Sequence, residues 1–460
     1  MIQAKHRLSA IILSGALMLG APLSNIPLMQ STVAANNKTV SFDEETGVLT
    51  LSGNVDKREV RKFYKNQKVQ SIIAEEGTIL PQDSSSMFFE FESVTSIDLS
   101  KADASNVTDM HSMFRECLKL KSLDLSNFDT SNVTTMHCMF MYCYDLENLD
   151  VSDFNTISVT NMNGMFGYCT SLKNLDVSDF DTSSVISMSG MFEKCYYLET
   201  LDVSGIDTSS VTDMSDMFYL CTSLKTLDLS DFNTSKVTNM RSMFDRCTSL
   251  ETLDLSGFDT SNVTNMSNMF YNCASLETLD LSGFDTSNVI TMRSMFNSCY
   301  SLKSLDLSSF NTIKVKDMDY MFEMLQSCEK LETVYVGDKW VTDAVQSDVD
   351  MFSGCSHITG GNGTVYNQDE ISSSYARVDE EGQPGYFSKK TSKIIGDLNG
   401  DGILSKADGM LLSRYTVGAA GSAVDPDVAD INGDGVISVA DRMILSRYLA
   451  GWEGYDQYFG

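Results

Sequence analysis

The stretch Leu253–Thr278, LDLSGFDTSNVTNMSNMFYNCASLET, is the unit from which most of the chain is built. Its Met-Phe pair recurs with each Met 26 residues after the previous one, at Met113, Met139, Met165, Met191, Met217, Met243, Met269, Met295 and Met321. A fixed period of roughly 20 to 50 residues is typical of repeat proteins, in which each coil buries its apolar face only against its neighbours. The period therefore predicts an α/β solenoid of about ten 26-residue coils.

Each copy has the pattern of a helix, a strand and a turn. Four apolar residues fall at i, i+3, i+4 and i+7 and predict one face of a short helix, namely Met266, Met269, Phe270 and Cys273. Thr264 precedes them as a candidate N-cap. Leu279-Asp280-Leu281 alternates as a half-buried strand does, and the polar residues 285–288 predict a return turn.

Composition limits the class of protein. The chain has 460 residues, enough for two or more domains, and its 42% hydrophobic content supports a substantial core. A net charge of −30 argues against nucleic acid as a partner, because phosphate repels such a surface.

Residues 1–35 have the pattern of a secretory signal peptide. Lys5 and Arg7 precede a short apolar run, and Val33-Ala34-Ala35 offers a cleavage site of small residues. No other apolar run is long enough for a membrane span. We therefore expect a secreted protein that acts outside the cell or on its surface.

The segment before the array is irregular. Residues 36–93 are expected to be an N-terminal cap that shields the first coil from solvent. Within it, Val48–Leu51 and Val69–Ile73 have the pattern of strands, and Arg58–Lys65 that of a helix. The array itself is predicted to span residues 94–336.

The array resembles the leucine-rich repeats of BspA-like bacterial surface proteins. The resemblance rests on Leu-x-x-Leu-Asp-Leu-Ser-x-Phe-Asp-Thr-Ser-x-Val followed by Met-x-x-Met-Phe-x-x-Cys, as in Leu250–Cys273. Residues 337–388 look like the C-terminal cap of that family, on the segments Gly360–Thr364, Ala376–Asp379 and Pro384–Phe387. The resemblance covers roughly residues 40–388 and implies a leucine-rich-repeat interaction surface without a shared chemistry.

Cysteine forms a column with one residue per coil, at Cys117, Cys143, Cys169, Cys195, Cys221, Cys247, Cys273 and Cys299. Coils about 5 Å apart would allow disulfides. Each sulfur has two equivalent neighbours, however, and free Cys is among the most buried residue types, so we expect buried thiols. Cys138 lies off the column and is expected near solvent, and without a CxxC motif a zinc site is unsupported.

Aspartate forms a second column on the predicted strands, and two interpretations of it remain open. Neighbouring hydroxyls and backbone N–H groups could satisfy these carboxylates, or the column could be a negatively charged ligand face. Nothing singles out two members as a catalytic pair for glycoside hydrolysis. The members are Asp124, Asp150, Asp176, Asp202, Asp228, Asp254, Asp280 and Asp306.

Tyrosines gather beside the Cys positions and also have two interpretations. They could hold a sugar or protein partner, or they could cover the edge of the core. The residues are Tyr142, Tyr144, Tyr168, Tyr196, Tyr197, Tyr271 and Tyr300.

The end of the chain carries two calcium-loop patterns. Side-chain oxygens stand at loop positions 1, 3, 5 and 12, a backbone carbonyl at 7, and Gly at 6 for the sharp turn. Two such loops predict two calcium ions. The predicted ligands are Asp397, Asn399, Asp401, Ile403 and Asp408 in the first loop, and Asp430, Asn432, Asp434, Val436 and Asp441 in the second.

Each loop leads into a helix with nearly the same sequence. After a linker at residues 389–393, the duplicated loop and helix of residues 394–460 resemble a type I dockerin, including Asp rather than Glu at position 12. The resemblance implies that calcium folds the module and that its two helices dock on a cohesin domain of a scaffoldin. The matching recognition residues are Lys406, Ser413, Arg414, Ser446 and Arg447.

These features together predict a secreted, non-catalytic adhesion protein. The solenoid would present a surface to an unknown protein or glycan, and the dockerin would attach it to a cellulosome or cell-surface scaffold. The alternative is an enzyme or accessory carbohydrate-binding protein of polysaccharide breakdown, since dockerins often carry such proteins. No constellation of residues interrupts the repeat as an active site should.

Overall fold

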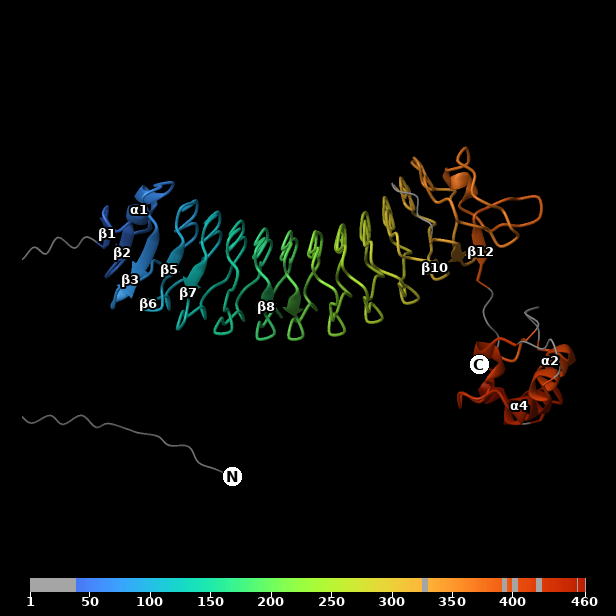
Figure 1. The fold of residues 1–460 in the computed structure, drawn as a ribbon. Coiled ribbons are helices and arrows are strands. Elements are labelled where there is room, and N and C mark those ends of the chain that lie inside the picture. Colours follow the sequence, from blue (N-terminus) through green and yellow to red (C-terminus); the bar gives the residue numbers. More distant parts are fainter. Residues whose placement is uncertain are drawn as a thin grey trace, which may run out of the picture. The chain divides into compact units, whose positions relative to one another are not determined.

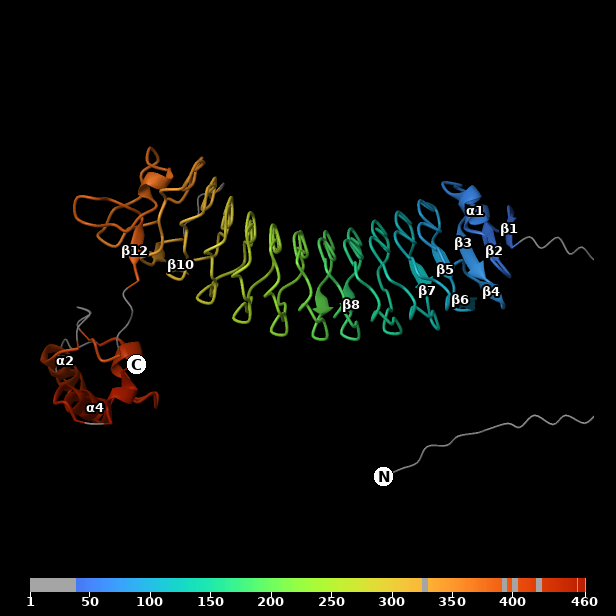
Figure 2. The same cartoon turned by 180° about the vertical axis from the view of Figure 1, so that it is seen from behind.

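The computed structural model describes residues 39–324, 330–390, 395–398, 404–418, 424–452 and 454–459. The predicted signal peptide, most of the linker and part of the first calcium loop lie outside these residues. Residues 39–324 and 330–390 form a stack of coils, which lie side by side in both views (Figures 1 and 2). The structure is thus the predicted solenoid, followed by a small helical module.

The N-terminal end of the stack is closed by a hairpin. Strand β1 (Val40–Asp43) pairs antiparallel with β2 (Val48–Leu51), and β2 pairs parallel with β3 (Ser71–Ala74). The predicted helix is shorter than expected, with α1 at Lys57–Val60 and a 3-10 turn, η1, at Arg61–Phe63. The antiparallel hairpin covers the edge of the first parallel coil, as a capping segment must.

Parallel pairing continues along the stack wherever the ladder is regular enough to form strands. The first sheet has the order β1-β2-β3-β5-β7, and β4 pairs with β6 and β8 with β9. The strands are β4 (Thr78–Ile79), β5 (Ser96–Asp98), β6 (Ala102–Asp103), β7 (Ser122–Asp124), β8 (Asn174–Asp176) and β9 (Thr200–Asp202). Coils without named strands keep the same alternation, since Leu279 and Leu281 are buried and Asp280 is exposed.

The predicted helix of each coil is wrong: the segment is a run of turns. Backbone N–H groups alternate between the same turn and the next coil, so Met269 N donates to Met266 O (3.2 Å) and Phe270 N donates to Met295 O (3.1 Å). Asn268 and Asn272 adopt positive φ of 57° and 53°, which a helix does not allow. Thr264 is not an N-cap, because its hydroxyl donates to Thr238 O of the preceding coil. We call the surface formed by these turns, residues 265–273 and their equivalents, the turn face.

Columns of identical side chains fill the core. Phenylalanine rings stack without a break from Phe88 to Phe352, with neighbouring centroids 5.4 to 5.9 Å apart. Met266 and Met269 represent two more columns, and both are fully buried. Because the rings of this column stack on those of the adjacent coils, the core has the nearest-neighbour character of a repeat protein.

The C-terminal end of the stack closes with three parallel strands, β10 (Ser304–Leu307), β11 (Thr333–Val336) and β12 (Phe387–Lys389). A 3-10 turn, η2 (Ser373–Tyr375), lies between β11 and β12. The buried carboxylate of Asp379 accepts hydrogen bonds from the backbone N–H groups of Asn362 and Thr364, both 2.9 Å long. This network fixes the loops that cover the last coil.

The helical module is built around two similar helices, α2 (Lys406–Thr416) and α4 (Val439–Leu449). The shorter α3 (Pro426–Ala429) precedes the second loop, and η3 (Asp456–Tyr458) lies near the chain end. Its small core consists of Leu412, Ala429, Ile431 and Leu445. None of the helices in the described part of the chain is long and apolar enough to cross a membrane.

Candidate functional site: the calcium loops and the faces of the solenoid

The second calcium loop is described in full, and its first aspartate organises the turn. Asp430 Oδ1 accepts hydrogen bonds from the N–H groups of Gly433 (3.0 Å) and Asp434 (3.2 Å), and Oδ2 accepts one from Gly435 (2.7 Å). Gly433 and Gly435 have φ of +70° and +83°, which a side chain would disfavour. The glycine at loop position 6 therefore has the role that its place in the pattern predicts.

Oxygen atoms from the other predicted positions lie along the same loop. Asn432 Oδ1 accepts from Asp434 N (2.9 Å), and Asp434 Oδ1 accepts from Val436 N (2.9 Å). Each side chain is thus held by its own backbone in a short turn. These contacts hold the side-chain oxygens in place along the loop.

The aspartate at position 12 has a second role that sequence reasoning missed. Asp441 is fully buried, and its Oδ1 accepts from Ile431 N (2.9 Å) while its Oδ2 accepts from Ser438 N (2.8 Å). Ser438 and Asp441 form a capping box on α4, and Ser405 and Asp408 form the same box on α2. The Ser-x-x-Asp spacing was the signal for this box. The residue at position 12 thus ties the start of its loop to the start of its helix.

Only the two ends of the first loop are described. Asp397 and Asp408 are both buried, and Asp408 Oδ1 accepts from Leu398 N (2.9 Å), as Asp441 does from Ile431. The predicted ligands Asn399, Asp401 and Ile403 lie outside the described residues.

The second loop suits calcium by its donor set. Its predicted ligands are carboxylate, amide and carbonyl oxygens, which hard cations prefer, and residues 430–441 include no Lys or Arg. No three His, Cys, Asp or Glu side chains are grouped tightly enough to hold a metal among the described residues, so the fit depends on this mixed set.

The predicted partner residues fall into two groups. Lys406, Ser413 and Ser446 line a common cleft of about 460 Å³ between α2 and α4. Arg414 is exposed on α2. Arg447 is held instead by the end of the chain, where its guanidinium donates to Tyr455 Oη and lies 5.3 Å from the ring centroid of Trp452.

The two halves of the module are therefore not equivalent. The position five residues after Arg447 is Trp452, whereas the position five residues after Arg414 is Ala419. Around both helices, apolar side chains are exposed, namely Met410, Tyr415 and Val417 near α2 and Val439, Met443 and Trp452 near α4. Such a surface is typical of a docking site.

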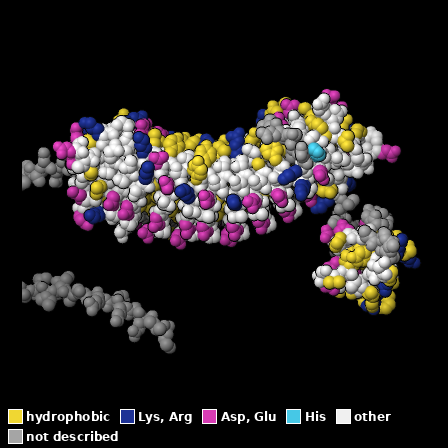
Figure 3. All heavy atoms as spheres, viewed as in Figure 1, with side chains coloured by type: hydrophobic (Ala, Val, Ile, Leu, Met, Phe, Trp, Pro, Cys, Tyr) yellow, Lys and Arg dark blue, Asp and Glu magenta, His cyan; other side chains and the backbone are white. Residues whose placement is uncertain are grey.

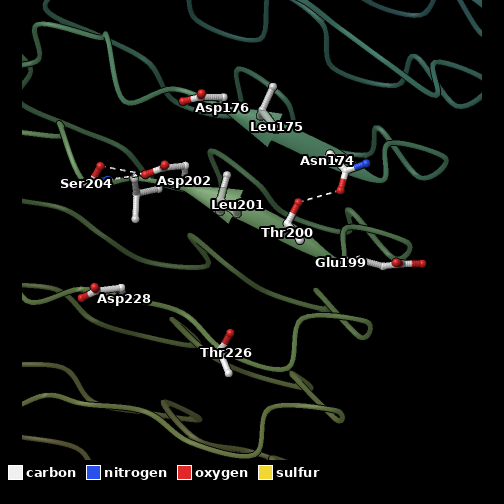
Figure 4. A pocket seen from close by; sticks show the side chains of 11 residues that line it. Asn174, Leu175, Asp176, Glu199, Thr200, Leu201, Asp202, Ser204, Thr226 and Asp228 are labelled. Atoms are coloured by element: carbon white, nitrogen blue, oxygen red, sulfur yellow. Dashed lines mark hydrogen bonds between the residues drawn. The ribbon is translucent and has the colours of Figure 1, made fainter.

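On the solenoid, the aspartate column follows the first of the two interpretations. Asp202 Oδ1 accepts from Ser204 N (3.1 Å) and from its hydroxyl (2.8 Å), as drawn in Figure 4. Every member of the column accepts from the N–H of the Ser two residues later. In Asp150 and Asp176 the Ser hydroxyl and then its N–H lower the pKa of the carboxyl, so these groups stay charged.

Shallow hollows lie between members of the column. One of them, about 780 Å³, is lined by Asp176, Asp202 and Asp228 together with Leu175 and Leu201 (Figure 4). Asp and Glu side chains crowd one edge of the stack in Figure 3. The surface of this edge is therefore strongly negative.

Some of the tyrosine rings pack against the core, as that of Tyr300 does, and others are exposed to solvent. Tyr142 and Tyr168 are 4.3 Å apart between centroids, and the ammonium of Lys194 lies 4.1 Å from the centroid of Tyr168. Tyr197 is 61% exposed. Sequence reasoning missed the charged residues among these rings, because they occupy the variable positions between Phe and Cys and follow no period.

The cysteine column consists of buried free thiols, as predicted. Each thiol lies near the backbone of the preceding coil, and Cys273 Sγ donates to Phe244 O (3.2 Å). Burial raises the pKa of Cys117 and Cys169 to about 12. The prediction for Cys138 is wrong: it is only 7% exposed, because the neighbouring turn at Gly164 covers it.

The stacked coils and the paired calcium loops define the class: a leucine-rich-repeat solenoid protein with a dockerin module. The chain belongs to the family described as "Mycoplasma protein of unknown function, DUF285", which matches residues 82–201, 168–255, 187–281 and 247–364. The "Dockerin type I domain" matches residues 395–450. Both resemblances expected from the sequence, to BspA-like repeats and to a type I dockerin, are confirmed.

The comparison with solved structures matches a leucine-rich repeat protein from Eubacterium ventriosum. It is 16% identical, and the similarity covers 69% of this chain and 93% of that chain with a TM-score of 0.31. The TLR13–ssRNA13 complex is 15% identical over 66% of this chain and 58% of that chain, with a TM-score of 0.17. No curated protein matches the chain. Type I dockerin domains generally bind calcium and attach to cohesins.

Proposed function

We propose that this is a secreted, non-catalytic recognition protein, attached through its dockerin to a cohesin domain of a scaffoldin in a cellulosome or on a cell surface. The observation that carries the proposal is the paired helical module. Two capped helices follow two loops of the same pattern and enclose a cleft lined by Lys406, Ser413 and Ser446.

Two calcium ions are proposed to complete the module, one in each loop. Asp397, Asn399, Asp401, Ile403 and Asp408 would hold the first, and Asp430, Asn432, Asp434, Val436 and Asp441 the second. Each ion would supply positive charge that offsets the crowded carboxylates. Because the core of the module is small, metal ligation would add folding free energy that burial alone does not provide.

The cohesin is proposed to bind across α2 and α4. The exposed apolar residues would supply buried area, and the guanidinium groups of Arg414 and Arg447 would supply planar hydrogen-bond donors. Trp452 and Tyr455 hold Arg447 in place, which lowers the entropy that it loses on binding.

The test is calorimetric titration of the full chain with a panel of cohesins, in calcium and in EDTA. We expect one cohesin to bind in calcium only, and the double variant Arg414→Ala/Arg447→Ala to bind at least about tenfold more weakly. Arg58→Ala, on an exposed side chain of the N-terminal cap, is the matched control. If no cohesin binds in calcium, the attachment role is wrong.

A further inference from the structure

A pocket of about 530 Å³ opens on the turn face, where four consecutive coils meet. Its lining includes Glu193, Asp216, Tyr219, Asp245, Arg246 and Tyr271. They stand at the variable positions of the repeat, so the regular coils do not require them.

Asp245 is the residue that points to a ligand. It is 7% exposed, and its Oδ1 has no hydrogen-bond partner among the described residues. The Nε atom of Arg246 lies 4.0 Å away, beyond hydrogen-bond length. The Ser242 hydroxyl stabilises the carboxylate, but it leaves the buried Oδ1 unsatisfied. A buried acceptor without a donor destabilises the fold, and a donor from a bound molecule would offset that cost.

Arg246 is held in position next to this acceptor. Its Nη1 donates to Tyr219 Oη (3.3 Å), and its guanidinium lies 5.2 Å from the ring centroid of Tyr271. Tyr219 and Tyr271 are 52 residues apart, so they come from coils on either side of the one that carries Arg246. Side chains from three successive coils thus hold the planar guanidinium of Arg246 near the rings of Tyr219 and Tyr271.

Charge in and around the pocket is mixed in sign. Glu193 Oε1 lies 3.3 Å from the ammonium nitrogen of Lys194, and Asp216 Oδ2 lies 3.4 Å from Nη1 of Arg241. Asp245 and Arg246 make a third, longer pair. A phosphate or sulfate would meet three carboxylates, and a cation would meet two guanidinium groups. A neutral molecule avoids both charge repulsions, and its hydroxyl groups can donate to the carboxylates and accept from the guanidinium groups.

We propose that this pocket binds a short segment of a neutral saccharide, with a sugar hydroxyl donating to the carboxylate of Asp245 and the side chains of Tyr219 and Arg246 contacting the ring. The volume lies within the ~300 to 1,000 Å³ range of small-molecule sites. The proposal deepens the recognition role given to the solenoid above, and it does not depend on attachment through the dockerin.

The experiment is calorimetric titration of the full chain with cellohexaose, xylohexaose and mannohexaose, alongside hexagalacturonate and hexalysine as charged probes. We expect a neutral oligosaccharide to bind, and both Asp245→Ala and Tyr219→Ala to weaken it at least about tenfold. Tyr197→Ala, which removes an exposed tyrosine outside the pocket, should leave the affinity unchanged.

Thermal unfolding first establishes which of the two variants, Asp245→Ala and Tyr219→Ala, is folded. If only one of them folds, that variant alone tests the proposal. The proposal is overturned if none of the neutral probes binds, or if folded variants bind as tightly as the parent. Displacement of the saccharide by hexalysine or by hexagalacturonate would also overturn it, since either would assign the pocket to a charged partner. Cohesin binding, measured separately on the same variants, distinguishes these failures from a failure of the attachment role.

Discussion

Replacing Asp245 with Asn should stabilise the solenoid at neutral and alkaline pH but not in acid. Burial raises the pKa of Asp245 from the ordinary 3.8 to about 7, although Arg246 and Ser242 oppose the shift. At ~1.4 kcal/mol per pH unit, a shift of this size corresponds to about 4 kcal/mol between the fully protonated and fully charged forms.

The sign follows from proton binding. Between pH 3.8 and about 7 the folded state holds the proton that the unfolded chain has released, so stability falls as pH rises through this window and is constant above it. Between pH 5 and pH 8 the parent should lose about 3 kcal/mol through this group. The variant Asp245→Asn carries no titrating proton at this position and should not show that loss.

Urea unfolding of parent and variant at pH 5, 6, 7 and 8, followed by circular dichroism, measures the difference. Asp254→Asn is the control, because this exposed carboxyl on the strand side has its pKa lowered by Ser256 and should show no gain in alkali. A difference between parent and Asp245→Asn that stays constant from pH 5 to pH 8 would refute the reasoning.

Three further outcomes are expected. EDTA should unfold α2 and α4 and leave the solenoid intact, which circular dichroism of the full chain and limited proteolysis would detect, and added calcium should restore the helices. The buried column thiols, such as Cys117 and Cys169, should not react with a disulfide reagent until the chain is denatured, and rapid native reaction would contradict their burial and raised pKa. Phe244→Ala should lower the free energy of unfolding by about 3 to 5 kcal/mol, because it removes one ring from the continuous stack, whereas Tyr197→Ala should change it by less than about 0.5 kcal/mol.

The sequence predicted the columns of the solenoid because they depend on period alone. Met269, Phe270 and Cys273 each recur at the same step, and an apolar residue that recurs in every coil must face the shared core. The Asx-type hydrogen bonds of the aspartate column were also predictable, since each Asp is followed by Ser two residues later.

The helix in each coil was mispredicted because its signal is ambiguous. Spacings of three and four residues fit a helical face, but they fit two consecutive turns equally well when neighbouring coils supply the remaining hydrogen-bond partners. Asn268 and Gly190 adopt positive φ at the position before Met, where small or polar residues predominate. That composition was the available sign of turns rather than helix.

The pocket at Asp245 and the anchoring of Arg447 could not be predicted for a different reason. Both depend on residues that differ between otherwise matching segments. Asp245 stands at a variable position of its coil, and Tyr455 follows the second helix but has no counterpart after the first. Periodicity identifies what the copies share, whereas these contacts arise where the copies differ.

The unbroken phenylalanine stack from Phe88 to Phe352 has a consequence for how the gene can change. Duplication or loss of 26 codons adds or removes one whole coil, and every ring still meets an identical neighbour. A shorter insertion keeps the stack only where its own coil can absorb it, as between Phe322 and Phe352, a step that is four residues longer than the others. The length of the protein can therefore evolve in whole coils of about 5 Å each, while both capped ends stay the same.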